Sequence, residues 1–195
     1  MKYAAIIAIH CLFFTAGAQV TTNIQWTKQS SLPAAEVIYY DETNKLVWDN
    51  FKAAPQERGI VAAVTFSGFG YMADIKSIAG KTQLNIKVYC YFNKNKSWVN
   101  PAKASPYILK HEQHHFDISY IAAGIFIDRV QNTIFSHTDY KTMLPILYQE
   151  CVDFMGKMQD EYDRKTKNGQ QKDKQEEWGR KINAMIKQPV AVNPA

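Results

Sequence analysis

The sequence is poor in cysteine, in periodic glycine and in long apolar runs. Its 3 cysteines among 195 residues are too few for a disulfide scaffold. Its 9 glycines follow no repeating period, which excludes a collagen-like chain. The apolar run from Ala4 to Phe14 is shorter than the roughly 20 residues that a membrane-spanning helix needs. The expected architecture is therefore one domain of ordinary size with short tails.

Charge of one sign is also scarce. The chain has 23 Lys and Arg against 18 Asp and Glu, a formal net charge of +5. The densest basic stretch, Arg164 to Lys174, is interrupted by Asn168, Gly169 and Asp173. An excess this small and scattered does not favour a nucleic-acid partner. A hydrophobic share of 46% and a charged share of 21% are typical of a folded soluble protein.

The first residues have the three-part pattern of a cleavable secretory signal. Lys2 precedes the apolar run, and Ala16-Gly17-Ala18 supplies the small residues of a cleavage site. We expect residues 1–18 to be a signal peptide cut after Ala18, and the mature protein to be secreted or periplasmic, without stable membrane insertion. Residues 19–34 are expected to form an N-terminal extension, 35–187 the domain and 188–195 a disordered tail.

Export leaves two cysteines in the mature chain, Cys90 and Cys151, because Cys11 lies in the leader. An oxidising compartment permits one disulfide between them. Both positions also suit an apolar core, since each lies among apolar neighbours. The sequence leaves a disulfide and two buried thiols open, and neither cysteine has zinc-ribbon spacing.

The first half of the domain has the patterns of β-strands. Two β-prone runs, Val37 to Tyr40 and Leu46 to Trp48, flank a turn-like segment and predict a hairpin. The segment 60–71 is a further strand, in which Gly68 and Gly70 indicate a bulge or a close backbone approach. The clearest strand, 84–92, alternates apolar residues with polar residues or tyrosine, which fits a sheet covered on one side.

The second half has the period of α-helices. Ser105 as N-cap and Pro106 as first helical residue begin a helix that runs to about Val130. A second helix is predicted from about 144 to 164, before the stop signal Asn168-Gly169, and a third, short one from about 171 to 186. The fold class is therefore α+β, a small antiparallel sheet in the N-terminal half packed with two long helices and a short C-terminal helix.

The residues 111–115 read H-E-x-x-H and lie in the first predicted helix. A spacing of four places His111 and His115 one turn apart on one helix face, where both imidazoles can bind one zinc ion (Zn²⁺). Glu112 lies beside the ion without binding it, and can take a proton from a zinc-activated water. The sequence therefore predicts a zincin-type metal centre. The alternative is a helix whose histidines are hydrogen-bonded core residues.

A catalytic zinc site needs a third protein ligand. The chain after His115 lacks the histidine that would extend the motif, so this ligand must come from elsewhere. The acidic second helix supplies the candidates, which are Glu150, Asp153, Asp160, Glu161 and Asp163.

The segment 109–118, L-K-H-E-Q-H-H-F-D-I, resembles the signature of a bacterial family of unknown function whose members are predicted secreted zinc-dependent proteases. The similarity extends from about Leu46 to Ile186. Its further pieces are Trp48-Asp49 with Phe51, Thr65, Lys96-Ser97-Trp98-Val99, Tyr162-Asp163 with Thr166 and Gly169, and Gln175 with Trp178. The resemblance implies that 35–187 is a zincin-like metallopeptidase domain.

The chain departs from that family at one position. The family pattern reads T-x-H before the closing Gly or Ser, whereas this chain has Thr166-Lys167-Asn168. If that histidine is the family's third ligand, this protein has lost it. We favour Asp163 as the ligand, because a carboxylate binds zinc far better than an amide. Tyr162 is a candidate hydrogen-bond donor to a developing oxyanion, with packing as the alternative.

These residues together predict a secreted zinc-dependent metallopeptidase. Zinc is held by His111, His115 and Asp163, Glu112 is the general base, and a peptide or protein substrate lies extended, pairing with an exposed sheet edge. Asp117 either orients a ligand histidine or lies on the helix surface. Two alternatives stay open, a degenerate module that binds cell-envelope protein or carbohydrate, and a structural zinc site with a fourth protein ligand.

Overall fold

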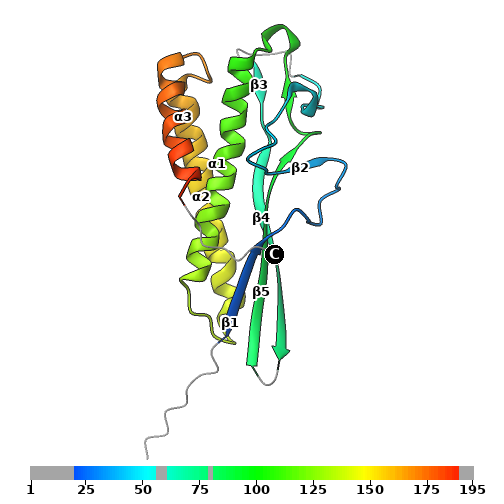
Figure 1. Cartoon of the computed structure of the whole chain (residues 1–195), viewed down its shortest axis with the longest axis vertical. Helices are drawn as coiled ribbons and strands as arrows, with labels where there is room; N and C mark the ends of the chain where they lie inside the picture. The colour runs from blue at the N-terminus through cyan, green and yellow to red at the C-terminus, as the bar shows by residue number, and fades with distance from the viewer. Residues whose placement is uncertain (1–19, 56–60, 79–80, 189–195) are drawn as a thin grey trace, which may run out of the picture.

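The computed structural model describes residues 20–55, 61–78 and 81–188. The predicted signal peptide, with its cut after Ala18, lies outside the described residues, as do residues 189–195 of the predicted tail. Across the described part, the chain forms a mixed α+β domain with helices on one side and strands on the other (Figure 1).

One long strand, β5 (Lys81–Asn93), organises the main sheet. β4 (Ser67–Ile78) pairs antiparallel with nearly its whole length, so the two remaining strands share the other edge. There β1 (Thr21–Trp26) pairs in parallel with residues 83–88, and β2 (Val37–Tyr39) pairs antiparallel with residues 91–93. A separate two-stranded sheet joins β3 (Ala63–Val64) to β6 (Trp98–Val99).

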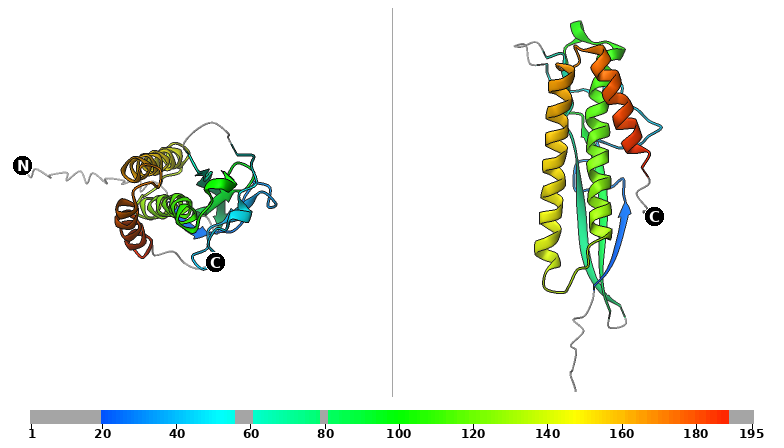
Figure 2. Two further views of the ribbon diagram at one scale, coloured as in Figure 1. Left: turned by 90° about the horizontal axis from the view of Figure 1, so that it is seen from above. Right: turned by 90° about the vertical axis from the view of Figure 1, so that its left-hand side faces the viewer.

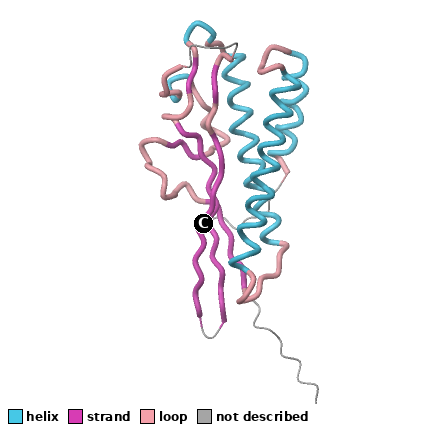
Figure 3. Tube along the Cα trace, turned by 180° about the vertical axis from the view of Figure 1, so that it is seen from behind, coloured by secondary structure: helices cyan, strands magenta, loops and turns pink. Residues whose placement is uncertain are grey.

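The helices α1 (Pro106–Gln131), α2 (Tyr140–Thr166) and α3 (Lys172–Ile186) cover one face of this sheet (Figure 2). Seen from behind, the strands form a layer separate from the helices (Figure 3). No helix in the described ranges is long and apolar enough to span a membrane.

The core lies on both sides of α1. Towards the sheet, Phe116 and Phe126 pack in one cluster with the inward residues of β5, among them Ile86 and Phe92. On its other side, Ile118 of α1 belongs to a smaller cluster with Met158, Tyr162, Trp178 and Ile182 from α2 and α3. Each fully buried side chain of this size stabilises the fold by about 1.5–3 kcal/mol. Because α1 lies between two apolar layers, most of its residues after Lys110 are buried.

The structure confirms the pattern-based elements and corrects several details. The β5 alternation and the Ser105 N-cap are as predicted, and α2 begins earlier, at Tyr140. The predicted strand 60–71 is divided, because β3 leaves the main sheet to pair with β6. Its glycines allow a close approach without a bulge, since a Cβ on Gly70 would lie 2.6 Å from the Tyr89 hydroxyl.

The predicted hairpin of residues 37–48 is wrong. Only its first half forms a strand, and Trp48–Asn50 is a short 3₁₀ helix. The reason is tertiary, because the backbone N–H of Leu46 donates to the Gln113 side chain of α1 at 2.8 Å instead of to a neighbouring strand.

The antiparallel sheet is correct for β2, β4 and β5 and wrong for β1, which pairs in parallel. β1 lies in the segment predicted as an N-terminal extension, and it belongs to the main sheet. Cys90 and Cys151 are both free and buried, so the disulfide alternative is not formed.

Candidate metal centre

The H-E-x-x-H segment lies in the second and third turns of α1. The helix begins at a fixed point, because the Ser105 hydroxyl accepts the backbone N–H of Ile108 at 3.2 Å and Pro106 occupies the first turn. His111 and His115 therefore stand one turn apart with ring centroids 5.0 Å from each other. Both side chains are buried, with residue exposures of 3% and 8%.

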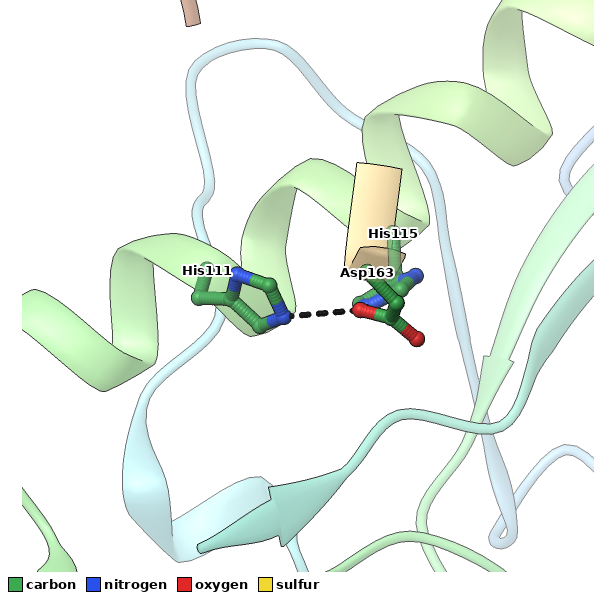
Figure 4. A group of neighbouring side chains, drawn as sticks. All are labelled: His111, His115 and Asp163. Atoms are coloured by element: carbon green, nitrogen blue, oxygen red, sulfur yellow. Dashed lines mark hydrogen bonds and ion pairs between the residues drawn. The ribbon is translucent and has the colours of Figure 1, made fainter. Parts of the chain in front are cut away.

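Asp163 joins the two histidines from the last turn of α2 (Figure 4). Its Oδ1 accepts from Nε2 of His111 and from Nε2 of His115, each at 3.0 Å. One ligand atom from each residue lies within 4.8 Å of the others, so the three could hold a metal ion. The prediction of Asp163 as the partner of these two histidines fits this geometry.

Electrostatics favour a charged carboxylate at this point. Burial by itself would raise the pKa of Asp163, but the hydrogen bonds from His111 and His115 outweigh it and hold the pKa well below its usual range. Burial would likewise lower the pKa of His115, but the Asp163 hydrogen bond and the Glu112 charge raise it above its ordinary value. The carboxylates of Asp163 and Glu112 therefore favour a positive charge at the position of the two imidazoles.

The chain reversal after α2 fixes the position of Asp163. Lys167 and Asn168 have left-handed φ values of 51° and 52°, and Gly169 follows with φ of 79°. A Cβ on Gly169 would lie 3.4 Å from two ring atoms of His111. The predicted stop signal thus ends α2 and also lets the turn pass directly against a candidate ligand.

A pocket of about 240 Å³ opens beside the three donors. Its walls are β3 with its flanking residues (61–65) on one side and α1 with the end of α2 on the other, and Glu112, Gln159 and Asn168 are among the lining residues. A larger pocket of about 560 Å³ lies near Trp26 and Tyr120 and contains none of the donors. The smaller pocket is the one that matters here, because it holds the titratable cluster.

Glu112 is buried in the wall of the pocket, with one carboxylate oxygen unpaired in the described part of the chain. It is 3% exposed, lines the pocket, and its Oε2 has no hydrogen-bond partner among the described residues. A buried, unpartnered carboxylate oxygen is costly, which indicates a role in binding or catalysis. The adjacent backbone is anchored, since the Thr65 hydroxyl donates to the Glu112 carbonyl at 3.2 Å.

Tyr162 is close to the centre, but not as an oxyanion donor. It is fully buried, does not line the pocket, and its hydroxyl is hydrogen-bonded to His114 Nδ1 at 2.9 Å. Burial raises the pKa of Tyr162 far above its usual range, and burial likewise lowers the pKa of His114 to about 3. The structure favours the packing alternative for Tyr162 over the oxyanion role, because its hydroxyl is buried, lies outside the pocket lining and is hydrogen-bonded to His114.

Asp117 also differs from both expectations. It is buried and accepts hydrogen bonds from the Tyr40 hydroxyl at 2.8 Å and from Gln113 Nε2 at 2.9 Å. The Tyr40 bond, together with the Leu46 N–H on Gln113, holds the segment 40–46 against α1. Among the described residues, the side-chain hydrogen bonds of His111 and His115 go to Asp163 and not to Asp117. Sequence reasoning missed the Tyr40 contact, because Tyr40 lies 77 positions before Asp117 in the chain.

The other acidic candidates on α2 do not reach the donors. Glu150 pairs with Arg129, and Asp153 accepts from Gln149 on its own helix. Asp160 and Glu161 are exposed and do not line the pocket. Asp163 alone of the five candidates joins the cluster.

Comparisons with protein-family models, with curated proteins and with solved structures found no match. The chemistry of the site is therefore argued from the three donor residues alone. Two imidazoles with one carboxylate form a ligand set that catalytic zinc uses, with a further position left for water or substrate. The three donors and the unpartnered oxygen of Glu112 fit such an ion.

Proposed function

We propose that this protein is a secreted, zincin-like zinc metallopeptidase. The observation that carries the proposal is the convergence of His111, His115 and Asp163, with Glu112 in the same pocket. The ligand spacing on α1, the acidic third donor and an adjacent free base match the arrangement that metal-assisted hydrolysis needs.

Zinc would be held by His111, His115 and Asp163, and when bound it polarises a carbonyl and acidifies water. Among the described residues the cluster has three members, which favours a catalytic site over a structural one with four protein ligands. This count supports hydrolysis over the structural-zinc alternative.

Glu112 is the general base and acid of the proposed reaction. Its free Oε2 accepts the proton of the attacking water and returns it to the nitrogen of the leaving amine. Burial of its side chain keeps bulk water away from this proton transfer, and the Thr65 contact fixes the local backbone.

A peptide substrate would lie along β3. The carbonyl of Ala62 accepts from Asn100 N–H on the β6 side, so the backbone groups of the next residue, Ala63, point away from β6. Ala63 also lines the pocket that holds the donors. An extended peptide can therefore add to this open edge and bring its carbonyl to Glu112.

The proposal is tested by metal analysis and proteolysis of the mature protein. We expect one zinc per chain and cleavage of a denatured protein substrate, and we expect Glu112→Gln to lower the cleavage rate roughly 10²–10⁴-fold while zinc stays bound. Glu150→Gln makes the same chemical change at an exposed site and serves as the control. A wild-type chain without zinc, or cleavage that survives Glu112→Gln, would contradict the proposal.

The second candidate is a degenerate module that keeps the fold and binds envelope protein or carbohydrate. The exposed Asn168 favours it, because it lines the pocket at the position where the similar family has histidine. Stoichiometric zinc without any cleavage would indicate a structural or degenerate site, and a chain without zinc would leave the binding module.

A further inference from the structure

Tyr162 contacts all three histidines of the segment 111–115. Its ring stacks on His111 with centroids 4.6 Å apart and planes at 21°. It meets His115 edge-on at 5.3 Å and 72°, and His114 at 5.7 Å and 69°. A single side chain of α2 is therefore in contact with both candidate imidazole ligands.

The ring of Tyr162 is itself held in place. Trp178 of α3 packs on it with centroids 5.6 Å apart, and the hydroxyl is satisfied by His114, so its burial leaves no unpaired polar group. α3 can approach because Gly179 has no side chain, and a Cβ there would lie 3.0 Å from His114 Cε1. All three helices thus fix one aromatic ring.

His111 lacks the usual means of orientation. In metal sites the second ring nitrogen of a ligand histidine normally donates to a carboxylate, carbonyl or water, which sets the plane of the ring. The Nδ1 of His111 is buried and has no partner among the described protein atoms. Beside the Asp163 hydrogen bond at Nε2, the stacked ring of Tyr162 restricts the plane of this imidazole from its face.

We propose that Tyr162 is a positioning residue of the metal centre, and that its aromatic ring sets the planes of His111 and His115 by stacking and edge contact, in place of a hydrogen bond to His111 Nδ1. This role rests on the proposed zinc function. It differs from an oxyanion role, because it needs the ring of Tyr162 and not its hydroxyl.

Measuring the zinc affinity of Tyr162 variants of the purified mature protein distinguishes a role of the Tyr162 ring from a role of its hydroxyl. Tyr162→Phe keeps the ring, and we expect its dissociation constant for zinc to stay within about 3-fold of wild type. Tyr162→Leu removes the ring, and we expect affinity to fall about 10–100-fold, the usual effect of losing an orienting neighbour. The absorption spectrum of bound Co²⁺ should change for Tyr162→Leu and be restored in Tyr162→Phe.

Phe126→Leu is the matched control, because it also removes a fully buried ring, at a position of α1 that packs against the sheet side. It should lower stability and leave zinc affinity unchanged. If Tyr162→Leu does not fold, Tyr162→Met replaces it, since methionine fills irregular gaps. Wild-type affinity in the folded ring-less variant, an equal loss in Phe126→Leu, or an equal loss in Tyr162→Phe would each overturn the proposal.

Crystal structures of the metal-free proteins keep this test separate from that of the proposed function. We expect His111 and His115 to leave Asp163 in the ring-less variant and to stay in Tyr162→Phe. Unchanged histidines in the ring-less variant would overturn the positioning role even if wild type bound zinc. A wild type without zinc would overturn the proposed function, and with it the role at a metal centre, while displaced histidines would still show that the Tyr162 ring sets the planes of His111 and His115.

Discussion

At the scale of single residues, the candidate metal centre depends on which carboxylate of α2 reaches α1. Successive residues turn by about 100° around a helix, so the acidic neighbours of Asp163 point in other directions. Asp160 and Glu161 are exposed, whereas Asp163 is half-buried and contacts both imidazoles. A single position on α2 therefore supplies the third donor.

The assignment of Asp163 as the third ligand predicts a large loss of zinc affinity for one alanine variant and almost none for another. Asp163→Ala should weaken zinc binding more than about 100-fold, since a ligand matters more than the outer contacts worth 10–100-fold. Asn168→Ala should change the dissociation constant less than about 3-fold, because Asn168 lies outside the donor cluster. Titration calorimetry measures both, with the exposed Asp160→Ala as control, and a large loss for Asn168→Ala would contradict the ligand set.

At the scale of elements, the end of α2 connects backbone conformation with the site. The αL residues Lys167 and Asn168 precede Gly169, and the Gly169 N–H donates to Thr166 Oγ1 at 3.3 Å. Thr166 in turn donates to the Tyr162 carbonyl at 2.8 Å. The turn thus holds the last helical residues, including Asp163, in one conformation.

Two glycines, one inside α2 and one in the turn after it, should change the unfolding free energy in opposite directions when replaced by alanine. Gly169→Ala should destabilise the fold by about 1–2 kcal/mol, because its φ of 79° is unfavourable for a residue with a Cβ and His111 and Ile108 lie close. Gly156→Ala, inside α2 with nothing within 4 Å of the new Cβ, should stabilise it by roughly 0.5–1 kcal/mol. Urea unfolding measures both, and equal shifts of the two midpoints would refute the conformational argument.

At the scale of the whole molecule, β1 closes the sheet from outside the predicted domain. It fills the edge of β5 that β2 leaves free, and Ile24 is buried opposite Ile86. Val20 is also buried, and its N–H donates to the Phe135 carbonyl at 3.2 Å, next to the link between α1 and α2. The segment before residue 35 therefore belongs to the folded unit.

Removing β1 should accordingly weaken the entire fold. Ile24→Ala should cost roughly 2–5 kcal/mol of unfolding free energy, as for other large-to-small changes in cores. Thr21→Ala, exposed on the same strand, should stay within about 0.5 kcal/mol. A chain that begins at residue 35 should melt at a lower temperature than the mature protein, and an unchanged melting curve would show that β1 is dispensable.

The sequence by itself determined β5, the start of α1 and the spacing of His111, Glu112 and His115. These features are local, since a period of two, an N-cap and a four-residue step need no information from distant residues. The helical pattern left five acids of one helix as candidates for the third ligand, and the family resemblance favoured Asp163 among them.

Tertiary structure decided the rest, because each remaining feature depends on partners far apart in the chain. The packing of α2 on α1 places Asp163 beside His111 and His115. It also places Tyr162, a predicted oxyanion donor, against the rings of three histidines. β1 pairs in parallel with the edge of β5 that β2 leaves free, and the Leu46 N–H donates to Gln113 instead of to a hairpin partner. Long-range pairing of this kind is set by the packing of whole elements, which no local pattern records.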